Sequence, residues 1–199
     1  MHNVLDKGSK SIKSSKPDED WCRFLYTADE FLVAYTVIPP RLMISLFLVG
    51  HAAELYLKAV FTKQTGNIDK AVRYGHRIKE LFIKCKENDK SFLPDLDYKR
   101  LENDVEYRKE KHLELYYVGK YLADLKYLGV SFSEMRDLQR YGPNYEWANF
   151  FRRIRLYLKY PPKGHKDFLK DNLNDLGLSD QHKNYLGIIL GKVGNLYKC

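Results

Sequence analysis

The strongest pattern in the chain is an almost continuous apolar run between residues 42 and 61. Its polar residues are Ser45, His51, Glu54 and Lys58. Such a run is typical of a helix buried on most sides, because no face is polar enough to meet water. At about 100° per residue, His51, Glu54 and Lys58 fall within an arc of roughly 60°. An unpaired buried charge is costly, so we expect other parts of the fold to supply partners for this arc.

Apolar periodicity and helix-breaking residues predict further helices along the chain. The expected ranges are 21–37, 41–65, 68–86 with a break near Gly75, 97–128, a helix or turn at 131–140, and an amphipathic helix from 180 to 199. Residues 147–160 fit both a helical face and the alternation of a strand. We favour a helix there, because Pro143 suits a helix start and Pro161 a helix end.

The helix expected at 97–128 also carries polar residues on its apolar stripe. The stripe consists of Leu101, Val105, Arg108, His112, Leu115, Gly119 and Leu122. Arg108 and His112, one turn apart, therefore occupy positions where the pattern calls for apolar side chains. The simplest pairing between the two helices is Glu54 with Arg108, a charge-assisted contact. Plain alternatives remain open: a Glu54–Lys58 pair within one helix, and ordinary polar contacts for Arg108 and His112.

Composition bounds the class of protein. A chain of 199 residues with 44% apolar residues can bury a single core, and a net charge of +8 makes polyanionic partners plausible. Glu54 and Lys58 argue against a membrane span, since each would cost about 2.5–3.5 kcal/mol in hydrocarbon. Three scattered cysteines without a CxxC pair indicate a cytoplasmic protein with free thiols. Residues 1–20, without an apolar leader segment, suggest a loose arm.

The chain resembles the HEPN domains at three places. His51, Glu54 and Lys58 form H-x-x-E-x-x-x-K, Gly75-His76 begins G-H-x-x-x-x-L-F, and Arg140-Tyr141-Gly142 is similar to a segment seen in many members. The resemblance implies an all-α, up-and-down bundle of four to five helices at residues 21–145. Residues 146–199 would then be a C-terminal extension packed on the bundle. The resemblance also implies a protein that often forms a homodimer. Such a protein binds RNA or nucleotides, cleaves RNA without a metal, or binds a partner protein.

The ribonuclease signature of that family is an arginine followed, after four to six residues, by a histidine. The nearest match here is Arg108 with His112, separated by three residues. On a helix this spacing still places both side chains on one face. His112 would serve as general base toward a ribose 2′-hydroxyl, and Arg108 would stabilise the charge that grows on the phosphate. The departure from the family spacing puts cleavage in doubt.

A basic and aromatic stretch near the C-terminus is a second candidate surface for RNA. Residues 147–166 contain no acidic residue, and Arg152, Arg153, Arg155 and Lys159 are interleaved with aromatic residues. Arginines contact phosphates and aromatic rings stack on unpaired bases, so this stretch is a candidate RNA-binding surface. A solvated face of an amphipathic element explains the same pattern.

Three functions from different classes therefore stand. The first is a HEPN-like protein associated with RNA or nucleotides, the second a metal-independent endoribonuclease using Arg108 and His112, and the third a dimeric partner-binding scaffold. No glycine-rich phosphate loop, nucleophile elbow or zinc-binding spacing is present in the sequence. We therefore expect neither a resident cofactor nor a metal. His51, Glu54, Lys58, His76 and Arg140 form the expected polar cluster.

Overall fold

The computed structural model describes residues 20–37, 43–104, 106, 145–163, 167–175, 178 and 180–191. Helices form most of these residues, and none of them belongs to a strand. The predicted all-α fold class is confirmed. None of the described helices is both long enough and apolar enough to cross a membrane.

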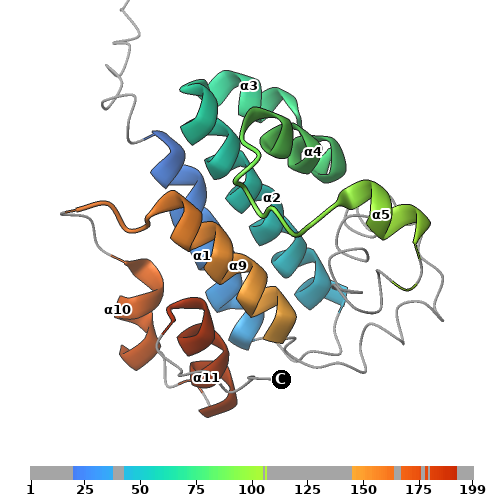
Figure 1. Cartoon of the computed structure of the whole chain (residues 1–199). Helices are drawn as coiled ribbons and strands as arrows, with labels where there is room; N and C mark the ends of the chain where they lie inside the picture. Colours follow the sequence, from blue (N-terminus) through green and yellow to red (C-terminus); the bar gives the residue numbers. More distant parts are fainter. Residues whose placement is uncertain are drawn as a thin grey trace, which may run out of the picture.

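Three helices form the centre of the molecule: α1 (Asp20–Val37), α2 (Met43–Thr65) and α9 (Tyr145–Leu158). In Figure 1, α9 (orange) passes in front of α1 (blue) and lies beside α2 (teal). The first two agree with the ranges expected from the apolar pattern. The third settles the ambiguity at 147–160 in favour of a helix.

The core is drawn from all three of these helices. Its fully buried large side chains include Leu25, Leu32, Tyr56, Leu57, Phe151, Ile154 and Leu158. The Tyr56 and Phe151 rings stack with their centroids 5.0 Å apart, so α2 and α9 meet at the centre of the core. Helix α9 therefore belongs to the same apolar cluster as α1 and α2. The domain boundary expected at 145/146 stays a prediction.

Two short helices follow α2 and cover one end of it. Gly66 adopts φ +64°, which favours glycine, and its N–H bonds to the carbonyl of Thr62 at the end of α2. The Asn67 side chain then caps α3 (Ile68–Arg73) by accepting from the N–H of Lys70. A turn at 74–77 leads into α4 (Ile78–Asn88). The break expected near Gly75 is confirmed, and Gly75 itself has φ +56°.

The long helix expected at 97–128 is wrong at its start. Asp97 caps a short helix, α5 (Tyr98–Asn103), and the chain then becomes extended at Asp104, with φ −118° and ψ 104°. Asparagine and aspartate favour such ends, because their side chains compete with the helical backbone hydrogen bonds. The rest of that range, including the stripe through Arg108 and His112, and the range 131–140 lie outside the described residues.

The C-terminal part adds α10 (Phe168–Asp175) and α11 (Asp180–Ile189). Helix α10 packs against α1, and α11 packs against α9. The apolar pattern predicted α11 but not α10. The described part of α11 ends before Gly191, and residues 192–199 lie outside the described residues.

Candidate functional site

Glu54 is the centre of a polar cluster between α2 and the turn at 74–77. The Lys58 ammonium nitrogen lies 2.6 Å from Oε1 of Glu54. The Nδ1 atom of His76 lies 2.8 Å from Oε2, and Nδ1 of His51 lies 3.8 Å from the same oxygen. We call these four residues the Glu54 cluster. Four of the five residues expected to form a polar cluster are therefore brought together.

Helical spacing and a glycine turn position these side chains. His51, Glu54 and Lys58 lie at i, i+3 and i+7 on α2, so they share one face. The positive φ of Gly75 turns the chain so that His76 faces this helix. The His51 ring is held between two aromatic rings: Phe31 meets it edge-on at 4.6 Å, and Phe47 stacks on it at 5.6 Å.

The Glu54 cluster is buried at its carboxylate and open at its histidines. The Glu54 side chain is 4% exposed, whereas the side chains of His51 and His76 are 25% and 37% exposed. Burial by itself raises the pKa of Glu54, but the hydrogen bonds from Lys58 and His76 outweigh it and hold that pKa below its ordinary value. Glu54 is therefore ionised at neutral pH.

The expected pairing of Glu54 with Arg108 stays a prediction, and the described residues show other partners for this carboxylate. Both of its oxygens already have partners, one on Lys58 and one on His76. Arg108, His112 and Arg140 lie outside the described residues, so their roles stay predictions.

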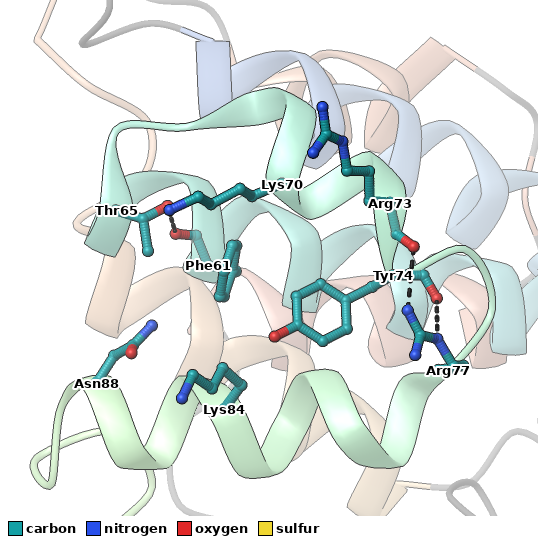
Figure 2. A pocket seen from close by; sticks show the side chains of 8 residues that line it. All are labelled: Phe61, Thr65, Lys70, Arg73, Tyr74, Arg77, Lys84 and Asn88. Carbon is teal, nitrogen blue, oxygen red and sulfur yellow. Dashed lines mark hydrogen bonds between the residues drawn. The ribbon is translucent and has the colours of Figure 1, made fainter.

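A second feature is a pocket of about 360 Å³ between α3, α4 and the end of α2. Its lining consists of Phe61, Thr65, Lys70, Arg73, Tyr74, Arg77, Lys84 and Asn88. Figure 2 shows the rings of Phe61 and Tyr74 at its centre, with Lys70 on one side and Lys84 on the other. The two rings meet edge-to-face with centroids 5.2 Å apart. We call this the α3–α4 pocket.

The charge of this pocket is positive throughout its lining. Four lining residues are basic and none is acidic. Arg77 folds back onto the carbonyls of Arg73 and Tyr74, as Figure 2 shows, and pairs with Glu80 outside the lining. Lys84 pairs with Glu87. Lys70 has no carboxylate partner among the described residues, so its ammonium group is available to an anion.

The turn at 74–77 belongs to both features. Tyr74 and Arg77 line the α3–α4 pocket, while His76 between them contacts Glu54. The carboxylate of Glu54 therefore helps to fix the stretch of backbone that carries Tyr74 and Arg77.

A second polar cluster lies among α1, α2 and α9. Both oxygens of Asp29 lie 2.6 Å from one guanidinium nitrogen of Arg155, and Tyr56 donates its hydroxyl to the same carboxylate. The other terminal nitrogen of Arg155 lies 2.6 Å from Asp167, which precedes α10. Arg155 is 4% exposed and Asp29 is fully buried. We call these four residues the Asp29 cluster.

The Asp29 cluster corrects one expectation about RNA. Arg155 was expected on an RNA-binding surface, but its guanidinium is buried and holds two carboxylates. A phosphate could reach it only if both ion pairs broke, so Arg155 leaves the set of candidate RNA contacts. Composition alone could not separate this arginine from its exposed neighbours.

The other three candidate RNA contacts in residues 147–166 differ in how accessible they are to a ligand. Arg153 pairs with Asp95 across the chain, and Arg152 lies beside Gly191 at the end of α11. Lys159 is exposed, just beyond the end of α9. The four residues therefore do not form one free basic surface.

Sequence reasoning missed the α3–α4 pocket, and it expected the Glu54 cluster without its metal-ligating character. The α3–α4 pocket could have been suspected from Lys70, Arg73 and Arg77, which recur at helical spacing beside Tyr74. The metal-ligating residue types His51, Glu54 and His76 place one donor atom each within 4.8 Å of one another. This grouping escaped the spacing rules, because His76 comes from a different element. No family model, curated protein or solved structure matches the chain.

Proposed function

We propose that this protein binds RNA or a nucleotide through the α3–α4 pocket. The observation that carries the proposal is the lining of the pocket, which combines basic and aromatic residues and includes no acidic residue. The proposal agrees with what the HEPN-like motifs imply. It places the contact at α3 and α4 instead of the basic stretch on α9.

The basic residues of the pocket suit a phosphate. Lys70 and Lys84 lie on opposite sides of it, so an anion in the pocket would have a positive charge on each side (Figure 2). Lys84 would exchange an exposed ion pair with Glu87 for contact with this anion. Exposed ion pairs contribute little to stability, about 0–1 kcal/mol, so breaking this pair costs little free energy.

The aromatic residues suit a base. Tyr74 is partly buried, with Phe61 against its edge and the Arg77 guanidinium 5.5 Å from its ring. A base that packs on the remaining surface of Tyr74 would gain about 1–3 kcal/mol, as stacking on proteins commonly does. A volume of about 360 Å³ falls within the range of small-ligand sites, which fits one nucleotide unit and not a longer stretch of RNA.

Fluorescence anisotropy with a labelled single-stranded RNA and a labelled adenine nucleotide tests the proposal. We expect the double variant K70Q/K84Q to weaken binding at least about tenfold, since two phosphate contacts are lost. The matched control is Lys90→Gln, an exposed lysine outside the lining. Wild-type affinity should also fall steeply between about 50 and 200 mM salt.

Three outcomes would contradict the proposal. The first is absence of binding by the wild type. The second is equal weakening by K70Q/K84Q and by Lys90→Gln, which would show only a loss of general charge. The third is weakening by Arg153→Gln with K70Q/K84Q unchanged, which would return the RNA contact to α9.

A further inference from the structure

Two histidines of the Glu54 cluster face the same carboxylate oxygen. His76 already serves Oε2 of Glu54 at 2.8 Å, and Lys58 serves Oε1. His51 Nδ1 faces the same Oε2 from 3.8 Å, which is beyond hydrogen-bond distance. Two imidazole nitrogens from two separate elements thus converge on one buried carboxylate oxygen.

The three donor atoms are of the kind that borderline transition metals bind. Two imidazole nitrogens and one carboxylate oxygen are the ligand set of many zinc sites with three protein ligands. Around a tetrahedral Zn²⁺, with bonds of about 2.0–2.2 Å, such atoms lie about 3.3 Å apart. Here the Nδ1 atom of His76 lies 2.8 Å from Oε2, closer than that, and one donor atom from each of the three residues lies within 4.8 Å of the other two.

The three donor atoms would have to approach one another only slightly, and the side chains that carry them can move. The widest separation has to shrink by about 1.5 Å at most to suit a tetrahedral ion. The His76 ring belongs to a turn and is 37% exposed, so it can rotate without disturbing the core. The exposure of both rings also gives an ion a path from solvent to Oε2.

Lys58 fixes the direction in which the carboxylate points. Its ammonium group lies 2.6 Å from Oε1, and the Lys58 side chain is only 9% exposed. Oε2 is therefore the oxygen turned toward the two partly exposed histidines. This is the arrangement of a ligand whose second oxygen is held by a neighbouring group, which keeps a metal-binding carboxylate oriented.

We propose that His51, Glu54 and His76 bind one divalent transition-metal ion of the Zn²⁺ class, through the two Nδ1 atoms and Oε2. A site with three protein ligands keeps a coordination position for water or another small ligand. The inference goes beyond the proposed binding of RNA or nucleotide and does not depend on it. A chain that binds Zn²⁺ but not RNA would support this site and contradict that function.

Isothermal titration of the EDTA-treated full chain with Zn²⁺ is the first test. We expect one equivalent of Zn²⁺ to bind, and His51→Gln and His76→Gln each to weaken binding at least about tenfold, the lower end of what loss of even an outer partner costs a metal site. His182→Gln on α11 is the matched control, a histidine remote from the site, and should bind as the wild type does.

Co²⁺ provides a second and independent measurement. A Co²⁺ ion held tetrahedrally by these ligands should give intense visible absorption bands, and they should disappear in His51→Gln and His76→Gln but persist in His182→Gln. Circular dichroism without metal verifies that each variant is folded. Absence of stoichiometric binding, unchanged affinity in either histidine variant, or equal loss in His182→Gln would overturn the site.

Discussion

Two buried carboxylates, Asp29 and Glu54, each gather cationic and polar side chains, and they differ in their access to water. Asp29 is fully buried, and the Arg155 guanidinium that holds it is 4% exposed. Glu54 is nearly as buried, but two of its neighbours are histidines with a quarter or more of their side chains exposed. The first arrangement can hold only what the fold supplies, whereas the second can exchange a partner with solvent.

The positions of the two clusters explain this difference. The Asp29 cluster joins α1, α2 and the start of α10 through one arginine on α9, so helices surround it (Figure 1). The Glu54 cluster lies on one face of α2, which the turn at 74–77 covers. Arg155 thus links elements within the fold, whereas Glu54 has partly exposed histidines as its neighbours.

The largest expected effect comes from breaking the sealed cluster. Arg155→Met should lower the free energy of unfolding by about 3–5 kcal/mol, because it leaves Asp29 buried without its cation. Urea denaturation followed by circular dichroism measures this. The double variant D29L/R155M should recover part of the loss, since it removes both charges. A loss below about 1 kcal/mol would show that the ion pair does not hold α9 in place.

A smaller effect concerns pH. Burial raises the pKa of Asp29 to about 6, even though Arg155 and Tyr56 act to lower it and the nearby Asp167 adds to the rise. The unfolded carboxyl group titrates near 3.8, so between the two values the folded state binds more protons. Stability conferred by this group is therefore present at low pH and is lost as pH rises from about 4 to about 6.

Asp29→Asn isolates that contribution, because an amide does not titrate. The unfolding free energy of the wild type minus that of Asp29→Asn should fall with rising pH across this window, by at most about 3 kcal/mol. Denaturation curves at several pH values measure the difference. A difference that grows with pH would mean that Arg155 outweighs burial and that the Asp29 pKa lies below its ordinary value.

The smallest effect belongs to the open cluster. His76→Gln, measured in EDTA, should lower the unfolding free energy by less than about 1 kcal/mol, since a contact made by a partly exposed side chain contributes little. Thermal unfolding beside Arg155→Met gives the comparison directly. A loss as large as that of Arg155→Met would remove the distinction between sealed and open clusters.

The sequence was informative where the residues of a single helix were sufficient for a prediction. The apolar run of α2 predicted its burial, and its polar arc predicted that His51, Glu54 and Lys58 would need partners. Contacts between elements could not be obtained in this way, because no spacing rule links His76 to Glu54 across twenty-two residues. The end of α5 was also missed, since periodicity continues through Asp104 although the backbone does not.

The sequence contains a pattern that predicts the burial of Arg155, although the basic composition of its stretch hides this pattern. Phe151, Arg155 and Leu158 share the i, i+4, i+7 spacing of a buried face, and so do Leu25, Asp29 and Leu32. Two opposite charges, each on an apolar stripe of its own helix, are the pattern that a buried ion pair produces. Composition alone groups Arg155 with its basic neighbours, whereas this spacing separates it from them.

The turn at 74–77 has one further consequence, which concerns thermodynamic linkage. Its central histidine contacts Glu54, while Tyr74 and Arg77 on either side line the α3–α4 pocket. A ligand that fixes this short backbone at one of the two sites has already met part of the ordering cost at the other. If an ion at Glu54 alters the affinity of the pocket for a phosphate by some factor, the phosphate must alter the affinity for the ion by the same factor.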